Sequence, residues 1–195
     1  MSLKIEVARR QLGMATHLYL HDLDPVSVHC LANAACELIE FYAKKFSGRA
    51  ILSLATLAPN TDFTKLRELQ RQYWIAFKHA TEQGKPGQER DDDQLLKHFT
   101  DEKNDLTLVI GWADYHRATG TIPIEAQVQQ AWYFALHPEK HASPELAQKI
   151  FPDLRTKTRA EQKRALNECI EAARTQKTMV ASETERRPLV LDWEF

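Results

Sequence analysis

Apolar residues recur at helical spacing along most of the chain, and strand-type alternation is almost absent. The clearest helical stretch begins at Asp24 and runs to Phe46, and no Gly interrupts it. Asp24 suits the N-cap because its carboxylate accepts a free backbone N–H, and Pro25 suits the first helical position because it lacks one. Apolar residues cover most of the circumference of this helix, so we expect it to be largely buried.

The polar residues of this helix fall into one stripe because they recur every three or four positions. The stripe consists of His29, Asn33, Glu37, Glu40 and Lys44. Two carboxylates buried beside a histidine would perturb one another's protonation, as catalytic groups often do. We favour two structural interpretations instead: the stripe is the wet face of the helix, or it is a satisfied polar network.

The same periodicity predicts an all-α fold with several further helices. Their ranges are about 3–20, 61–80, 95–118, 121–136, 143–151 and 157–181. The polar patch 100–105 interrupts the third of these ranges, and it can divide that helix into two pieces. The apolar segment from Ala50 to Leu57 fits a short helix or a strand; we favour a helix, because no other segment offers a strand partner.

These elements predict one domain over residues 1–195. Its core is an antiparallel bundle of about four main helices over about 3–136, and shorter C-terminal helices and a tail occupy about 143–195. The tail from Pro188 to Phe195 is apolar for a terminus, so we expect it to dock on the body or on a partner chain.

The segment 81–94 contains no apolar residue and includes Gly84, Pro86 and Gly87, which predicts a mobile surface loop. The densest charge cluster of the chain, Glu89-Arg90-Asp91-Asp92-Asp93, lies in this loop. A run of carboxylates can indicate a metal site. We favour a solvated loop that also N-caps the following helix.

Composition and charge narrow the function only slightly. Hydrophobic residues make up 43% of the chain and charged residues 27%, and the formal net charge is −1, so no global electrostatic argument favours nucleic acid or acidic lipid. Between Arg155 and Lys177, a stretch that includes most of the last predicted helix, the chain carries seven Lys or Arg and three Glu. These side chains could contact phosphates, but the absence of interleaved aromatics favours a solvated face.

The start of the chain has no pattern of a targeting signal, and no apolar run approaches the roughly 20 residues of a membrane span. The three cysteines, Cys30, Cys36 and Cys169, are an odd number on apolar helical faces. We interpret them as buried free thiols in a reducing compartment, which predicts a cytoplasmic protein with no membrane partner.

His17 and His21 are four residues apart on the first predicted helix, a spacing at which two imidazoles can share a divalent metal. A working site needs a third and a fourth ligand, and the chain has no Glu-x-x-His, His-Glu-x-x-His or Cys-x-x-Cys motif to supply them. We therefore expect no metal and no other cofactor. A metal-dependent enzyme using His17, His21 and the carboxylates of the stripe is the weakest of our hypotheses.

Three segments together resemble a group of uncharacterised bacterial all-helical proteins. The segments run from Val7 to His29, from Ala76 to His79, and from Asp114 through Thr119-Gly120 to Pro123, so that the resemblance spans about residues 5–125. The middle motif of that group is in turn similar to the signature of the HEPN superfamily. This resemblance implies a compact, often dimeric helical bundle, and many members are metal-independent ribonucleases or toxins paired with an antitoxin.

The HEPN motif pairs an arginine with a histidine: the histidine handles a ribose 2′-hydroxyl proton, and the arginine stabilises the phosphorane charge. In this chain His79 matches the motif histidine and Lys78 the lysine before it. Trp74 and Ile75 stand where the motif has its arginine and asparagine. The nearest upstream arginine, Arg71, is separated from His79 by seven residues, whereas the motif allows four to six.

The sequence therefore favours a non-catalytic, HEPN-like module that binds a protein partner or self-associates, for example as a dimer, with RNA a possible partner. The alternative is a metal-independent endoribonuclease using His79, with Arg71 or an arginine of a partner chain as the cation. A structural interpretation of His79, a helix-face histidine hydrogen-bonded near the Thr81 loop, is favoured over its catalytic role.

Overall fold

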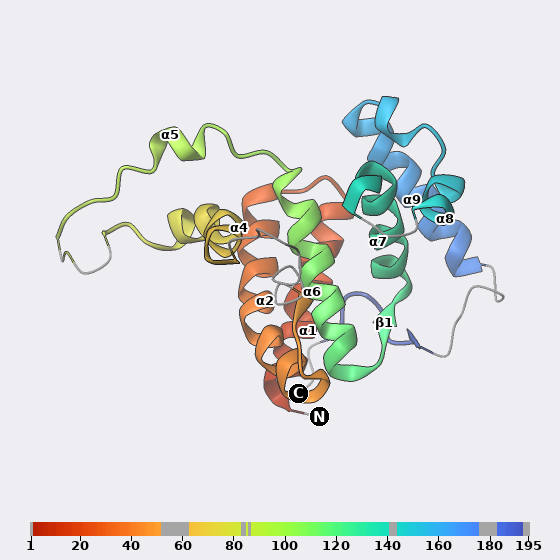
Figure 1. Cartoon of the computed structure of the whole chain (residues 1–195), viewed down its shortest axis with the longest axis horizontal. Coiled ribbons are helices and arrows are strands. Elements are labelled where there is room, and N and C mark those ends of the chain that lie inside the picture. Colours follow the sequence, from red (N-terminus) through yellow and green to blue (C-terminus); the bar gives the residue numbers. More distant parts are fainter. Residues whose placement is uncertain are drawn as a thin grey trace. The chain divides into compact units, whose positions relative to one another are not determined.

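A computed structural model describes residues 2–51, 63–82, 85, 87–140, 144–175 and 183–192. Its elements are predominantly helical, which confirms the all-α prediction (Figure 1). Two compact units make up the chain, Met1–Ala118 and Thr119–Phe195. We describe each unit by itself, and the single domain over 1–195 stays a prediction.

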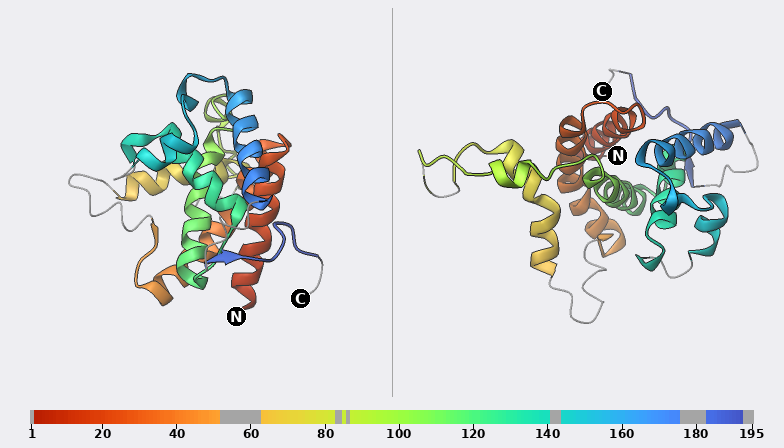
Figure 2. Two further views of the ribbon diagram at one scale, coloured as in Figure 1. Left: turned by 90° about the vertical axis from the view of Figure 1, so that its right-hand side faces the viewer. Right: turned by 90° about the horizontal axis from the view of Figure 1, so that it is seen from above.

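The first unit begins with a pair of adjacent helices, α1 (Leu3–Leu20) and α2 (Pro25–Ser47), joined by a short turn (Figures 1 and 2). Burial follows the predicted periodicity in α1. Its core positions are Ile5, Ala8, Leu12, Ala15 and Tyr19, and all of them are at most 2% exposed.

The start of α2 confirms the prediction. The Asp24 carboxylate accepts the backbone N–H groups of Val26 and Ser27 at 3.3 and 2.9 Å, and Pro25 occupies the first turn. The Ser27 hydroxyl also donates to this carboxylate, and this bond, together with the two backbone bonds, lowers the pKa of Asp24. Gly48 ends the helix in the left-handed conformation, with φ of 78°, which glycine adopts without a steric penalty.

The remaining described helices of this unit are α4 (Phe63–Lys78), the short α5 (Asp93–Leu96) and α6 (Lys103–Thr119). The chain leaves α5 before the polar patch and enters α6 within it, which confirms the expected interruption. Of the segment Ala50–Leu57, only Ala50 and Ile51 belong to the described residues, so the choice between helix and strand lies outside them.

One local prediction for the acidic cluster is wrong. Asp92 occupies the N-cap of α5 but makes no capping hydrogen bond with its side chain. Its carboxylate instead accepts two hydrogen bonds from the Arg90 guanidinium, at 2.6 and 2.8 Å. A charged, bidentate partner two residues away competes successfully with the neutral N–H groups of a four-residue helix.

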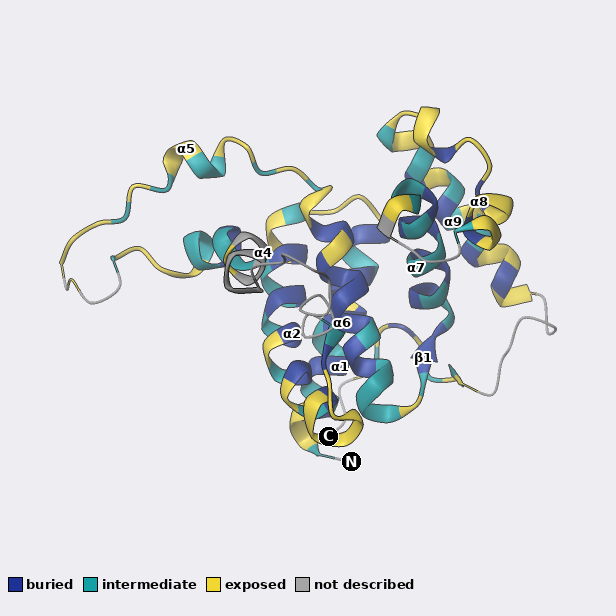
Figure 3. Cartoon of the chain, in the orientation of Figure 1, coloured by how far each residue is buried: buried dark blue, intermediate teal, exposed yellow. Residues whose placement is uncertain are grey.

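Helix α6 packs against α1 and α2 at a point where a side chain would not fit. A Cβ on Gly111 would lie 2.6 Å from Cδ2 of Leu12 and 3.1 Å from Sγ of Cys36. The next residue, Trp112, is fully buried, and its indole N–H donates to Oγ1 of Thr16 at 2.8 Å. Buried residues lie along α1, α2 and α6 (Figure 3). The core of the first unit thus depends on both close packing and buried hydrogen bonds.

The second unit is built around α7 (Ile124–Leu136), which packs against α8 (Glu145–Ile150) and α9 (Arg159–Thr175). The short 3-10 helices η2 (Pro138–Lys140) and η3 (Leu154–Thr156) lie between them in sequence. The sequence predicts that the helix over 121–136 belongs to the N-terminal bundle, whereas its contacts place α7 in this unit.

A two-residue parallel pairing also belongs to the second unit. Strand β1 (Ile122–Pro123) pairs with β2 (Thr184–Glu185). The residues before α7 are therefore extended, whereas the sequence predicts that the helix begins at about residue 121. Leu189 in the tail is buried, and residues 193–195 lie outside the described residues. None of the helices among the described residues is long and apolar enough to cross a membrane.

Candidate functional site

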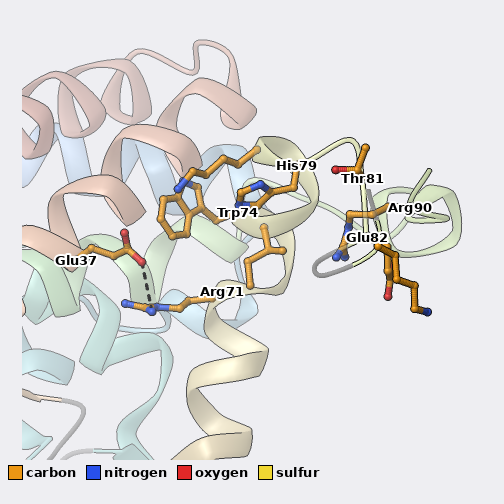
Figure 4. A pocket seen from close by; sticks show the side chains of 10 residues that line it. Glu37, Arg71, Trp74, His79, Thr81, Glu82 and Arg90 are labelled. Atoms are coloured by element: carbon orange, nitrogen blue, oxygen red, sulfur yellow. Dashed lines mark ion pairs between the residues drawn. The ribbon is translucent and has the colours of Figure 1, made fainter. Parts of the chain in front are cut away.

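A pocket of about 600 Å³ lies in the first unit (Figure 4). Its walls come from the C-terminal half of α4, from the loop that follows and from one residue of α2. The lining residues are Glu37, Arg71, Trp74, Ile75, Lys78, His79, Thr81, Glu82, Lys85 and Arg90. All three residues that the sequence nominated for catalysis, Arg71, Lys78 and His79, therefore line one pocket.

The α4 wall follows from helical spacing. Arg71, Trp74, Ile75 and Lys78 follow one another at intervals of three, one and three positions, which places them on one face of the helix. The spacing could have identified this face from the sequence. We missed Trp74 and Ile75 as lining residues because we treated them only as replacements in the HEPN motif.

Lys78 and Trp74 contact each other in this wall. The Lys78 ammonium lies 4.5 Å from the centroid of the Trp74 ring, a cation–π geometry that holds a charged group over a ring that is only 8% exposed. His79 follows directly, and its backbone N–H still bonds to the Ile75 carbonyl at 3.0 Å. The side chain of His79 is exposed, as expected for a residue one position beyond the helix end.

Arg71 connects α4 to the stripe of α2. Its guanidinium lies 3.3 Å from a Glu37 carboxylate oxygen and 3.8 Å from one of Glu40. Lys44 forms a further ion pair with Glu40 at 2.7 Å. This end of the stripe is a network of ion pairs, which supports the second of our two structural interpretations.

The other end of the stripe is buried, so the wet-face interpretation does not hold there. His29 is 1% and Asn33 2% exposed. The Asn33 amide donates to the His29 carbonyl at 2.9 Å, and the His29 ring bonds to Asn104 of α6. Neither residue lines the pocket.

The loop supplies the opposite wall of the pocket with Glu82, Lys85 and Arg90. Backbone bonds hold the loop folded back on itself: the Arg90 N–H donates to the Ala80 carbonyl at 3.1 Å, and the Glu82 N–H donates to the Gln88 carbonyl at 2.9 Å. The hydrogen bonds from Arg90 lower the pKa of Asp92. Four Lys or Arg and two Glu line the pocket. Glu40 and Asp92, which pair with Arg71 and Arg90 from outside the lining, compensate part of this positive charge.

His17 of α1 and His21, the residue just after this helix, lie together but without further ligands among the described residues. The rings of His17 and His21 have centroids 4.2 Å apart, and Nδ1 of His21 lies 2.8 Å from the His17 carbonyl oxygen. Among the described residues, no group of three or more His, Cys, Asp or Glu side chains is arranged to hold a metal ion. The metal-dependent hypothesis therefore gains no third ligand from the described part of the chain.

Comparisons with protein-family models, with curated proteins and with solved structures found no match to this chain. The candidate site must therefore be judged on its own geometry.

Proposed function

We propose that the protein is a non-catalytic binding module that holds the phosphate groups of an anionic ligand in the α4 pocket. The observation that carries this proposal is the convergence of Arg71, Lys78, Lys85 and Arg90 around one cavity, against two carboxylates. A cluster of cations beside a half-apolar wall attracts phosphates over a distance and offers a surface to the group attached to them. RNA is the ligand class that we would test first.

The ion pairs of Arg71 favour binding over catalysis. A catalytic cation must meet the charge that develops on phosphorus in the transition state. The charge of Arg71 is already compensated by Glu37 and Glu40. Arg90 is likewise paired with Asp92. Non-specific phosphate binding needs only a positive local potential, and Lys78 and Lys85 are the lining cations that supply it.

Fluorescence anisotropy with a mixed-sequence single-stranded RNA in EDTA tests this proposal. A double variant, Lys78→Ala with Lys85→Ala, should bind about tenfold more weakly, and the slope of log K against log salt should fall by about 1.4 in magnitude. Lys149→Ala is the matched control, because Lys149 is an exposed lysine of α8 that does not line the pocket. RNA affinity that is equal in all three proteins would reject the pocket as the binding site.

A second candidate function is a metal-independent endoribonuclease. The shared pocket of Arg71, Lys78 and His79 supports it, because a base and a cation would have to act on the same phosphodiester. The same RNA, incubated with protein in EDTA and analysed on a gel, should be cleaved by the wild type and not by His79→Ala. Intact RNA, or cleavage that does not depend on His79, would leave the binding module.

Self-association, as a dimer or with a protein partner, is a further part of the proposal. Phe41 and Phe46 of α2 are 62% and 57% exposed, and such apolar surface is typical of contact sites. Gel filtration with light scattering should show a dimer at high protein concentration, and a strict monomer would contradict this part. We also propose a cytoplasmic location, which the free state of all three cysteines supports.

A further inference from the structure

His29 lies in an enclosure of three aromatic rings, which we call the aromatic box. Tyr73 and Phe77 of α4 and Phe99, between α5 and α6, form it. Their ring centroids lie 6.2, 5.9 and 5.2 Å from that of His29, in that order, with interplanar angles of 75–88°. The rings also contact one another, with Phe99 5.2 Å from Tyr73 and 4.9 Å from Phe77.

Hydrogen bonds outside the box determine which nitrogen of His29 carries the proton. The Asn104 amide nitrogen donates to the Pro25 carbonyl at 3.1 Å, so Oδ1 of Asn104 is directed at Nδ1 of His29, 2.8 Å away. An amide oxygen accepts only, and Nδ1 must therefore carry the hydrogen.

The second nitrogen, Nε2, then carries only a lone pair. It is buried and has no hydrogen-bond partner in the part of the chain that the structure describes. A buried polar atom without a partner usually has a specific reason.

We propose that the aromatic box is a proton-operated latch: it closes on neutral His29, and a proton taken up at Nε2 releases the C-terminal half of α4 and Phe99 from α2. The proton comes from solvent and forms an N–H bond at Nε2, and the imidazole becomes an imidazolium with no other bond changed.

The surroundings of His29 favour the neutral ring. Burial lowers the pKa of His29, and the hydrogen bond with Asn104, which acts in the opposite direction, is the smaller effect. Burying an unpaired charge costs more than the attraction of aromatic faces for a cation returns. A new N–H at Nε2 would also need an acceptor, which the rings of the box supply only weakly.

The titratable groups near the box do not offset this cost. Tyr73 donates its hydroxyl to the His98 carbonyl at 3.3 Å, and the Lys103 ammonium, beside Asn104, lies 5.9 Å from the Tyr73 ring. The nearest acidic residue in sequence on α6, Asp105, accepts a hydrogen bond from Tyr19 at 2.6 Å. A lysine near the box repels an imidazolium.

The direction of the pH effect follows from the lowered pKa of His29. Above about pH 6.5, the ordinary histidine value, neither the closed nor the open state holds the proton, and the latch has its full stability. As the pH falls below that value the open state takes up the proton first, so closure weakens until the pH passes the pKa of the closed state.

Opening would loosen one wall of the pocket, because Arg71, Trp74 and Lys78 lie on the same helix as Tyr73 and Phe77. The latch itself does not rest on the proposed function, since its test measures backbone opening and uses no ligand.

Hydrogen exchange followed by mass spectrometry, corrected for the intrinsic pH dependence of exchange, tests the latch on the full chain. In the wild type, the opening constant of peptides covering about 71–80 and 97–104 should rise by up to about tenfold between pH 7.5 and 5.5. His29→Asn, which keeps an N–H directed at Asn104 but cannot titrate, should show no such rise. His98→Asn, which removes an exposed histidine of the same segment, should retain it.

A second variant changes the effect without removing His29. Asn104→Asp places a carboxylate at Nδ1, stabilises the imidazolium inside the box and should reduce the rise at low pH. NMR titration of the His29 ring in the wild type gives its pKa directly, even if His29→Asn does not fold. The proposal is overturned if His29 titrates normally while α4 stays protected, or if His29→Asn and the wild type open equally at low pH.

Discussion

The two ends of the polar stripe on α2 have the same spacing in sequence but different kinds of partner in the structure. At one end His29 and Asn33 are at most 2% exposed and make neutral hydrogen bonds. At the other end Glu37 is exposed and, with Glu40, pairs with Arg71 of α4. The comparison teaches that a polar stripe does not determine its own function: the partner helices decide whether it is a buried hydrogen-bond site or a charged pocket wall.

The largest change in the free energy of unfolding should follow the loss of Asn104, the hydrogen-bond acceptor of His29 at the buried end. Asn104→Ala removes the partners of the His29 Nδ1–H and of the Pro25 carbonyl, and it should lower the free energy of unfolding by about 2–4 kcal/mol. Urea denaturation at neutral pH measures this loss. A loss no larger than that caused by Glu37→Ala would contradict the contrast between the two ends.

A substitution at Asp114 of α6, close to the charged end, should have an intermediate effect and should raise the free energy of unfolding rather than lower it. Burial, with a contribution from the negative charge of Glu40, raises the pKa of Asp114 from the ordinary aspartate value of 3.8 to about 6. The folded state therefore binds the proton more tightly, so the stability contributed by protonated Asp114 is complete below about pH 3.8 and is lost as the pH rises through about 6.

Asp114→Asn should consequently raise the free energy of unfolding by about 1–3 kcal/mol near pH 7.5 and by little near pH 4. The Asn oxygen can still accept the Ile51 N–H that the Asp114 carboxylate accepts at 2.7 Å. Melting temperatures across this pH range provide the measurement. Destabilisation at neutral pH would show that the carboxylate charge supports the fold, contrary to this expectation.

The smallest effect should be that of Glu37→Ala at the charged end. The Glu37 side chain, which pairs with Arg71, is 40% exposed. Removing this ion pair should therefore lower the free energy of unfolding by about 0.2–1 kcal/mol. Molar NaCl should reduce this difference further, because salt screens exposed charges. Parallel urea melts of wild type and variant at low and high salt test both statements.

The same variant sharpens the functional side of the comparison. Without Glu37, Arg71 keeps only the longer contact with Glu40, at 3.8 Å, and more of its charge faces the pocket. RNA affinity of Glu37→Ala should therefore rise by about twofold to tenfold over the wild type, measured by anisotropy at one fixed salt concentration. Unchanged or weaker binding would indicate that Arg71 does not contribute to the ligand site.

Local signals predicted most of the secondary structure. Asp24 and Pro25 mark the start of α2 and Gly48 its end, because caps depend on residues within one turn of each other. The interruption before α6 also followed from the polar patch 100–105. The capping role expected for the acidic cluster failed, since Arg90 offered Asp92 a stronger partner than the helix end.

The candidate site was predicted in part. Arg71, Lys78 and His79 were identified through the HEPN resemblance, and the pocket brings them together, whereas Arg90, Lys85 and Glu82 were missed. The missed residues lie in the loop 81–94, whose composition indicates only a surface loop. No periodicity relates a loop side chain to a helix face, so the opposite wall could not be placed.

The sequence by itself determined the helical class, the ends of α2 and the stripe, because propensity, capping and periodicity act between residues a few positions apart. Only the tertiary structure decided what each part of the stripe does. His29 bonds to a residue 75 positions away, and it lies beside rings from α4 and from the segment before α6. Such contacts depend on which helices pack together, and the periodicity of one helix does not identify the helix that it packs against.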